Sequence, residues 1–285
     1  MTPDPKTHDL LREGVRRLPP ELTSPALDAE VLLAHVLGVP RAHVRSHSEE
    51  TRTAAERARY VALLERRARG EPLAYILGYK DFWSLRLAVT PAVLVPRPET
   101  ELLVERALAL APREQARVVD IGTGSGAIAL ALARERPGWQ IVATELSAEA
   151  LDVARRNAAD LAIDTVEFLQ GDGFAPLAGR RFDVLLSNPP YVGDEDPVLS
   201  APPLRFEPRV ALTPGADAMA CLSTFIGAAP RHLERGGWLL LEHGALQAAA
   251  VARELVARGF AHVRSHRDLA GHERITEASW NERMA

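Results

Sequence analysis

The chain has 285 residues, of which 47% are hydrophobic and 25% charged, proportions that are typical of a soluble globular protein with a sizeable core. Its formal net charge of -4 speaks against a protein that coats nucleic acid, which would carry a large positive charge. The single cysteine, Cys221, excludes an internal disulfide framework and fits a reducing compartment.

Neither a membrane span nor a secretion signal is visible. No apolar run approaches the roughly 18 residues of a membrane-spanning helix, and the N-terminal MTPDPKTHDL lacks the apolar centre of a signal peptide. We therefore expect a cytoplasmic protein with no membrane partner. The length suits one large domain or two unequal ones.

Helical patterns run through residues 1–80, which are predicted to form a small N-terminal helical bundle. Ser24 is suited to cap a helix that stops at Gly38, and Thr53 and Glu56 have the spacing of a capping box. Leu10, Leu11, Val15 and Leu18 would lie on one face of the first helix.

Arginines crowd the helix that begins after Thr53 and ends near Gly70. They could form a binding patch or a solvated helix face, and we favour the solvated face because charge runs usually have that role. The arginines are Arg57, Arg59, Arg66, Arg67 and Arg69.

Residues 81–98 are predicted to form short strands or a hairpin that links the bundle to a larger domain, residues 99–285. In that domain strands and helices alternate, which predicts a parallel sheet with helices on both faces. The segments HVRSH and RITEA are expected to form a closing pair of strands. Such sheets bind ligands at the carboxyl ends of their strands, so functional residues should follow strands directly.

The stretch DIGTGSG follows the first of these strands. Glycines at Gly122, Gly124 and Gly126 allow a sharp turn and a close approach of a ligand to the backbone. A tight strand-to-helix turn without a ligand is the alternative explanation of the glycines. Glu145 favours the ligand, because it ends the next strand at the usual spacing of ~20 residues and can accept hydrogen bonds from ribose hydroxyls.

The glycine spacing is G-x-G-x-G, whereas the dinucleotide fingerprint is G-x-G-x-x-G with a pyrophosphate on the helix N-terminus. S-adenosylmethionine has no phosphate and therefore suits this loop better. Asp172 follows the third strand, where it could accept from the adenine amino group or simply occupy a turn.

Asn188, Pro189, Pro190 and Tyr191 follow the fourth strand and face the same cleft. The prolines stiffen the chain at that point. Methyl transfer to an amide or exocyclic amine requires acceptors for two N–H groups, which would aim the nitrogen lone pair at the methyl carbon. The Asn188 side-chain oxygen and the Pro189 carbonyl can be those acceptors, and the ring of Tyr191 can stack on the planar group.

Other candidates are weaker. His262 and His266 could share a strand face, but no carboxylate or cysteine completes a metal site, so no metal is predicted. Cys221 is expected to lie in the core. No general base is expected. Arg97, Glu99 and Thr100 could shape the substrate mouth or serve as capping and salt-bridging residues.

The sequence resembles the HemK/PrmC family of protein-(glutamine-N5) methyltransferases over nearly its whole length. The matching stretches are GEPLAYILGYKDFWSLRLAVTPAVLVPRPETELLVE, DIGTGSGAIALALARERP, SNPPY, RFEPRVAL and ERGGWLLLE. The resemblance implies a seven-stranded Rossmann-like class I methyltransferase domain with a small N-terminal helical bundle. It also implies that the substrate is the glutamine in the Gly-Gly-Gln motif of class-one peptide release factors.

By position, the resemblance places Gly122, Thr123, Gly124, Ser125 and Gly126 along the cofactor, Glu145 at its ribose, and Asn188, Pro189, Pro190 and Tyr191 around the glutamine amide. We also expect Asp172, Gly173 and Asn188 to contact the cofactor. Many members have Asp in place of Glu145 and an aromatic residue in place of Gly173, for which Phe174 could substitute. An apolar residue often replaces His243, and the C-terminal tail is more polar than usual.

Two other functions share some of these features. N6-adenine methylation of nucleic acid uses the same Asn-Pro-Pro-Tyr motif, but this acidic chain has no large insertion for target recognition, so no direct nucleic-acid partner is expected. The glycine spacing speaks against a nicotinamide-dependent oxidoreductase.

A single glutamine side chain buries too little surface for a specific protein complex, which usually buries more than ~1,000 Å² in total. We therefore expect the bundle, residues 1–80, to dock the substrate protein.

Overall fold

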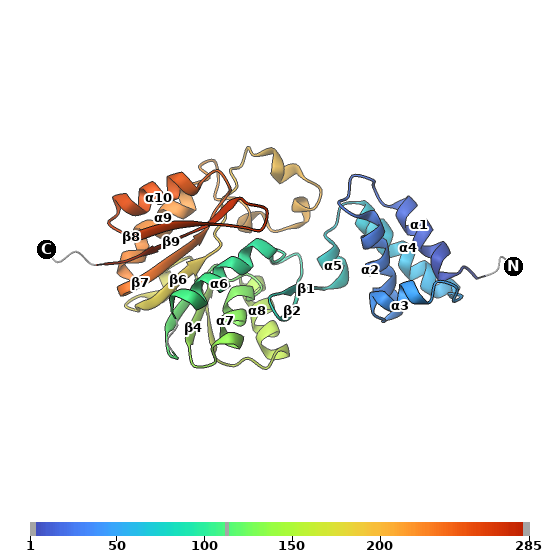
Figure 1. Cartoon of the computed structure of the whole chain (residues 1–285), viewed down its shortest axis with the longest axis horizontal. Helices are drawn as coiled ribbons and strands as arrows, with labels where there is room; N and C mark the ends of the chain where they lie inside the picture. Colours follow the sequence, from blue (N-terminus) through green and yellow to red (C-terminus); the bar gives the residue numbers. More distant parts are fainter. Residues whose placement is uncertain (1–3, 112–113, 282–285) are drawn as a thin grey trace. The chain divides into compact units, whose positions relative to one another are not determined.

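The computed structural model describes residues 4–111 and 114–281, and the chain forms two compact units (Figure 1). The first unit contains the chain up to Gly78 together with the segment Pro202–Phe206. The other described residues form the second unit. None of the helices in the described ranges is both long and apolar enough to cross a membrane.

Helices make up the first unit, as the sequence predicts. They are α1 (Thr7–Arg17), α2 (Pro25–Leu37), α3 (Arg41–Ser46), α4 (Ala54–Ala68), α5 (Leu73–Leu77) and the short 3-10 helix η4 (Leu204–Phe206). The Thr53–Glu56 capping box is confirmed, since Thr53 Oγ accepts from Glu56 N at 3.2 Å and Glu56 Oε2 accepts from Thr53 N at 2.7 Å. Ser24 stands at the N-cap of α2, but its side chain makes no capping hydrogen bond.

Apolar residues from α1, α2 and α4 form a separate core in this unit, with Leu10, Leu33 and Leu64 fully buried. Tyr60 is also fully buried, and its hydroxyl donates to the Ala29 carbonyl at 3.1 Å. The backbone of Gly70 lies close to Pro202, because a Cβ added to Gly70 would be 2.6 Å from Pro202 Cβ.

Three of the crowded arginines are paired with acids of the same unit. Arg57 contacts Glu13 at 3.0 Å, and Arg67 contacts Asp28 at 2.7 Å. Arg66 pairs with Glu71. These pairs neutralise most of the cluster, which agrees with a helix face whose charges are balanced inside the unit.

The second unit begins with an antiparallel hairpin of β1 (Tyr79–Phe82) and β2 (Leu85–Ala88), so the predicted linker, residues 81–98, belongs to this unit. Phe82 and Leu87, on the apolar face of the hairpin, pack into the hydrophobic core of this unit.

A seven-stranded sheet with the order β5-β4-β3-β6-β7-β9-β8 forms the centre of this unit. All neighbouring strands from β5 to β7 are parallel, and β9 is antiparallel to both β7 and β8, which confirms the predicted closing pair. The strands are β3 (Arg117–Ile121), β4 (Gln140–Glu145), β5 (Val166–Gln170), β6 (Phe182–Ser187), β7 (Leu233–Glu242), β8 (Ala261–Arg267) and β9 (Glu273–Ser279).

Helices cover both faces of the sheet (Figure 1). One face packs on α6 (Glu101–Leu110), α7 (Ala127–Glu135) and α8 (Ala148–Asp160), and the other on α9 (Ala220–Ala228) and α10 (Ala248–Ala257). The short 3-10 helices are η1 (Pro98–Thr100), η2 (Ala175–Leu177), η3 (Pro197–Ser200), η5 (Arg209–Ala211) and η6 (Ala229–Arg231).

The polar residues of the last strand have partners inside the fold. Glu277 is 4% exposed and pairs with Arg106 at 2.9 Å. Buried His243 stands 2.8 Å from Thr276 Oγ1, and its Nδ1 lies 3.0 Å from the Gly244 carbonyl, which can only accept. The unusual polarity of this tail therefore serves packing within the sheet.

The strand order reverses between β3 and β6, because β3 is followed by β4 on one side and the chain later returns to β6 on the other. In open parallel sheets this is the place where ligands bind, at the carboxyl ends of the strands.

Candidate active site

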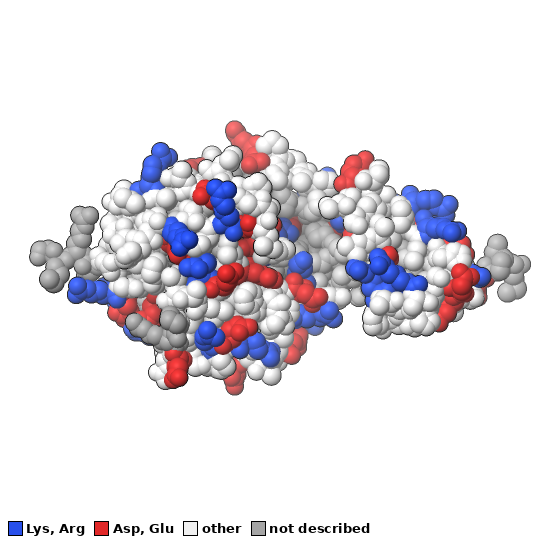
Figure 2. All heavy atoms as spheres, in the orientation of Figure 1, with Lys and Arg blue, Asp and Glu red and all other residues white. Residues whose placement is uncertain are grey.

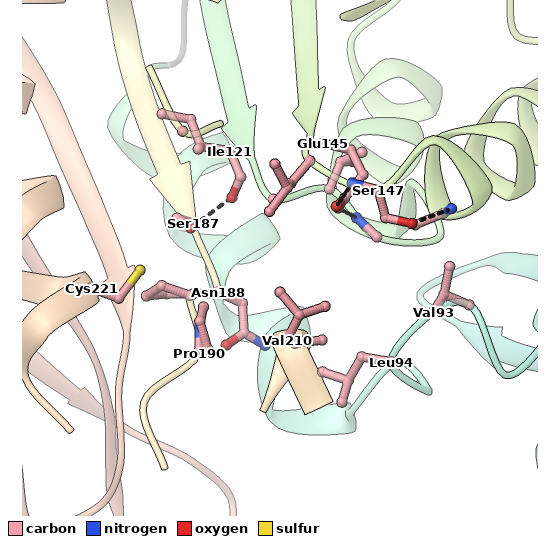
Figure 3. Close-up of a pocket in the computed structure, with 18 of the residues that line it drawn as sticks. Val93, Leu94, Ile121, Glu145, Ser147, Ser187, Asn188, Pro190, Val210 and Cys221 are labelled. Carbon is pink, nitrogen blue, oxygen red and sulfur yellow. Dashed lines mark hydrogen bonds between the residues drawn. The ribbon is translucent and has the colours of Figure 1, made fainter. Parts of the chain in front are cut away.

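A pocket of about 770 Å³ opens at the carboxyl ends of β3, β4 and β6, which is in the size range of small-molecule sites. Figure 3 shows Glu145, Asn188 and Leu94 around this pocket. Among the residues predicted from the sequence, it is lined by Gly122, Thr123, Gly124, Ser125, Glu145, Asp172, Gly173, Asn188, Pro189 and Pro190. Gly126 and Tyr191 are not part of its lining.

The glycine loop has the left-handed backbone that glycine permits, with φ of 75° at Gly122 and 56° at Gly124. A Cβ at either position would meet no atom within 4 Å, so these two glycines are needed for backbone conformation and for approach from the pocket. At Gly126 a Cβ would lie 3.0 Å from Leu130 and 3.3 Å from Ala154. Gly126 therefore allows α7 and α8 to pack closely.

Hydrogen bonds from inside the fold hold the loop. Buried Asp120 accepts from the Thr123 hydroxyl at 2.6 Å, and burial raises the pKa of Asp120 to about 7. The Gly122 and Thr123 N–H groups both donate to the Thr144 carbonyl, at 2.9 and 3.0 Å. These contacts tie the loop after β3 to the end of β4.

Glu145 connects two loops at the edge of the pocket (Figure 3). Its Oε2 accepts from the Gly124 N–H at 2.9 Å, and its Oε1 accepts from the Ser147 N–H at 3.0 Å. Each carboxylate oxygen can accept more than one hydrogen bond, so both retain acceptor capacity toward the pocket. Glu145 thus fixes the glycine loop, a role that the sequence did not reveal.

The loop after β5 supplies Asp172, Gly173 and Phe174 to the pocket. Gly173 has a φ of 50°, and a Cβ there would meet no atom within 4 Å. The Phe174 ring stacks on His232 with centroids 4.9 Å apart and meets the edge of Phe225 at 5.4 Å. Phe174 is therefore an aromatic wall that packing holds in place.

Asn188 follows β6 and points into the pocket (Figure 3). The strand end before it is fixed, because the buried Ser187 hydroxyl donates to the Ile121 carbonyl at 2.6 Å. Asn188 Nδ2 donates to Thr100 Oγ1 at 3.2 Å. Thr100 is thus a pocket residue, and its neighbour Arg97 lines the pocket as well.

Tyr191 makes different contacts from its neighbours in the motif. Its ring packs against the core under α9 and α10, and its hydroxyl donates to Glu242 Oε1 at 3.2 Å. Stacking of this ring on the substrate stays a prediction. The contact that the structure shows is with Glu242, a buried acid at the end of β7 that sequence reasoning missed.

A second buried acid, Glu207, binds the segment around Val95 and Arg97, which lines the side of the pocket opposite the strand ends. Its side chain is fully buried, and it accepts from Val95 N at 3.0 Å and pairs with Arg97. Residues on either side of Val95 line the pocket, as do several residues that follow Glu207. They are Ala92, Val93, Leu94, Pro96 and Arg97, and Pro208, Val210, Ala211, Thr213 and Pro214. Glu207 lies in the stretch RFEPRVAL, but its partner is 110 positions away in the sequence, at Arg97, so no local pattern predicts the contact.

Cys221 differs from its predicted place in the core, because it is half-buried on α9 and lines the pocket. Burial, and then the charge of Asp172, raise the pKa of Cys221 to about 11, so the thiol stays protonated at neutral pH and is a weak nucleophile.

The histidines named from the sequence have separate partners. His262 contacts Ser279 Oγ at 2.9 Å, and His266 lies 3.0 Å from Glu277. In the first unit His43, His47 and Glu50 place ligand-type atoms within 4.8 Å of one another, a grouping that the sequence did not suggest. The two rings stack, with centroids 3.8 Å apart, and Glu50 pairs with Arg52.

Comparisons with known proteins cover both units. Residues 9–78 match the model of the PrmC N-terminal domain, and residues 98–201 match that of the methyltransferase small domain. The chain is 46% identical over 266 residues to the release factor glutamine methyltransferase of Salmonella typhimurium, covering 93% of this chain and 96% of that protein. It is 50% identical over 258 residues to the enzyme of the same name from Burkholderia pseudomallei, covering 88% and 90%.

A solved structure of a methyltransferase from Pyrococcus furiosus superposes with a TM-score of 0.54 at 20% identity. It covers 76% of this chain and 98% of that one. At this identity the likeness concerns the fold, and it agrees with the α/β architecture described above.

Proposed function

The chain belongs to the family of release factor glutamine methyltransferases, and from this premise we propose the reaction and the roles of the pocket residues. The protein transfers a methyl group from S-adenosylmethionine to the side-chain amide nitrogen, N5, of the glutamine in the Gly-Gly-Gln motif of class-one peptide release factors. The observation that supports this most is the position of Asn188 and Pro189 in the same pocket as the glycine loop and Glu145.

The glycine loop and Glu145 fit the methyl donor. Gly122 and Gly124 leave the backbone open to the pocket, and the remaining acceptor capacity of Glu145 can receive the two ribose hydroxyls. Asp172 is assigned to the adenine amino group, with Phe174 as the aromatic wall beside it. When bound, S-adenosylmethionine supplies an electrophilic methyl group on a cationic sulfur.

Asn188 and Pro189 orient the acceptor nitrogen. An amide nitrogen is a poor nucleophile because its lone pair is delocalised into the carbonyl group. The Asn188 side-chain oxygen and the Pro189 carbonyl accept its two N–H groups, which aims the lone pair toward the methyl carbon at near-attack distance. The nitrogen loses its proton to solvent after transfer, so no protein base is required.

The partner of this site is a release factor in the cytoplasm. A glutamine on an extended loop can enter the pocket, but one side chain buries too little surface for a specific complex. The helical unit up to Gly78, which contributes no residue to the pocket lining, is assigned to docking the rest of the release factor.

Labelling distinguishes this function from methylation of adenine. The protein is incubated with S-adenosylmethionine carrying a labelled methyl group and either a release factor, the same factor with Gly-Gly-Ala in place of Gly-Gly-Gln, or duplex and single-stranded DNA. We expect label in the unaltered release factor alone. Label in DNA, or equal label in the Gly-Gly-Ala factor, would refute the proposal.

A further inference from the structure

We propose that Glu242 and Thr100 set the orientation of the Asn188 amide, so that both are positioning residues for methyl transfer. The inference rests on the role proposed above for Asn188. It concerns a chain of three side chains from three elements: β7, η1 and the loop after β6.

The three side chains are joined by two hydrogen bonds. Thr100 Oγ1 lies 2.7 Å from Glu242 Oε2, and Asn188 Nδ2 lies 3.2 Å from Thr100 Oγ1. Glu242 is 1% exposed and Thr100 5% exposed, so solvent does not compete for the bond between these two side chains. Strand register places the two ends together, since Ser187 pairs with Leu241 and the next residues are Asn188 and Glu242.

The donors and acceptors along this chain can be assigned from the chemistry of the groups. An ionised carboxylate only accepts, so Thr100 must give its single hydroxyl hydrogen to Glu242. Thr100 Oγ1 then has only lone pairs to offer, and Asn188 must turn its NH₂ group toward it. The Asn188 oxygen consequently faces away from Thr100, where it can accept from the substrate amide.

Glu242 also holds the other end of the motif. Its second oxygen, Oε1, accepts from the Tyr191 hydroxyl at 3.2 Å. One carboxylate thus fixes Tyr191 directly and Asn188 through Thr100. This arrangement explains why a strand-end acid is kept in a fully buried place, where a charge is costly to maintain.

Protonation of Glu242 would remove the fixed order of donors and acceptors in the hydrogen bonds that join Glu242, Thr100 and Asn188. A protonated carboxyl can donate to Thr100, whose own hydrogen could then go to the Asn188 oxygen and turn the amide round. Burial raises the pKa of Glu242 to about 7, while Thr100, Tyr191 and Arg274 favour the charged form. Glu99 opposes it, and the buried imidazole of the adjacent His243 has a lowered pKa, so it is uncharged in this range.

The test compares Thr100→Val with Thr100→Ser in the full-length protein, with methylation of intact release factor as the readout. Valine keeps the shape of threonine and removes the hydroxyl, whereas serine keeps the hydroxyl. We expect Thr100→Val to lower kcat on the order of 10- to 100-fold, as expected for a misplaced reacting group, and Thr100→Ser to retain most of the rate. The Kd for S-adenosylmethionine should stay within about threefold in both, which also shows that the variants fold.

A double variant separates this inference from the proposed function. If Thr100 acts through Asn188, then Thr100→Val should cost nothing further in an Asn188→Ala background. Losses that multiply in the double variant would overturn the chain of positioning. A wild-type rate in Asn188→Ala alone would instead refute the proposed role of Asn188.

Glu242→Gln adds a readout that a purely structural residue would not change. Glutamine can accept from Thr100 through its oxygen or donate to it through its NH₂ group, so its rate should lie below that of the ionised wild type, and it cannot titrate. The kcat of the wild type should rise with pH through about 7 as Glu242 loses its proton, and this rise should be absent in Glu242→Gln. The same rise in both proteins would overturn the part assigned to Glu242.

Discussion

The carboxylate of Glu145 combines a structural and a proposed binding role in one side chain. Its position at the end of β4 was predictable from the spacing after the glycines, because that spacing reflects one βαβ unit. Its hydrogen bonds to Gly124 and Ser147 were not, since they depend on how two loops meet in space. Glu145 is thus bonded to the backbone of the loops on both sides.

Replacing Glu145 with alanine should weaken binding of S-adenosylmethionine by about 1.5–3 kcal/mol, because charged acceptors for the ribose are lost together with the clamp on the glycine loop. Isothermal titration calorimetry with S-adenosylmethionine and its demethylated product measures this. Glu145→Asp, which keeps the charge, is the matched control and should lose less. An unchanged affinity in Glu145→Ala would contradict the ribose contact, and tight binding of NAD would contradict the choice of cofactor.

Asn188 should affect turnover far more than cofactor binding. In Asn188→Ala one of the two proposed acceptors for the glutamine amide is missing, so kcat should fall on the order of 100-fold. The Kd for S-adenosylmethionine should remain within about threefold. Steady-state methylation at saturating release factor gives kcat, and calorimetry gives the Kd. Turnover within a few-fold of the wild type would show that Asn188 does not orient the amide.

At the level of elements, regular structure was predictable and irregular structure was not. The alternation of strands and helices after residue 100 gave the sheet, and the capping-box spacing located the start of α4. The chain between β6 and α9 has only short 3-10 helices, and long-range bonds such as Glu207 to Val95 decide its course. Such bonds leave no periodic pattern in the sequence, so the course of the irregular segments that line the pocket opposite the strand ends could not be predicted.

Glu207 should therefore be essential for this irregular segment. Glu207→Ala leaves the Val95 N–H and the partly exposed Arg97 without their acceptor and should lower the free energy of unfolding of the second unit by about 1–3 kcal/mol. Urea denaturation followed by tryptophan fluorescence measures it. Asp81→Asn, at an ion pair that is 64% exposed on both sides, is the control and should cost no more than about 1 kcal/mol. A loss in Glu207→Ala no larger than the small loss in the control would show that Glu207 is not essential for this segment.

For the whole molecule, the division into two units suggests that the first unit can be removed while the pocket in the second unit stays intact. All residues that line the pocket belong to the second unit. The first unit, however, is not one stretch of sequence, because it includes Pro202–Phe206, which follows the Asn-Pro-Pro-Tyr motif by about a dozen residues. The helical patterns predicted the bundle, but no local pattern indicated that this later segment belongs to it.

A shortened chain that begins at Tyr79, the first residue of β1, should keep its affinity for S-adenosylmethionine and lose much of its activity on an intact release factor. Its activity on a short Gly-Gly-Gln peptide should fall less, because a peptide has no further surface to dock. Calorimetry and circular dichroism check that the shortened chain folds, and kcat/KM on the two substrates gives the comparison. Neutralising Arg57, Arg66 and Arg67 in the full-length chain should matter less, since acids of the same unit already pair with them.

Equal kcat/KM on intact release factor for the folded shortened chain and the full-length protein would remove the docking role. The bundle would then be a stabilising appendage of the second unit.

The two oxygens that we propose as acceptors, those of Asn188 and Pro189, would also discriminate against a chemically damaged substrate. Glutamine side chains hydrolyse with time to glutamate, which brings two oxygens and a negative charge where the amide would bring two hydrogens. A site that presents only lone pairs at this point repels that charge and leaves its own acceptors unsatisfied, a mismatch of the kind that buried polar sites reject strongly. Glutamate has no amide nitrogen to receive the methyl group, and this mismatch would also keep its carboxylate from being methylated on oxygen in the same pocket.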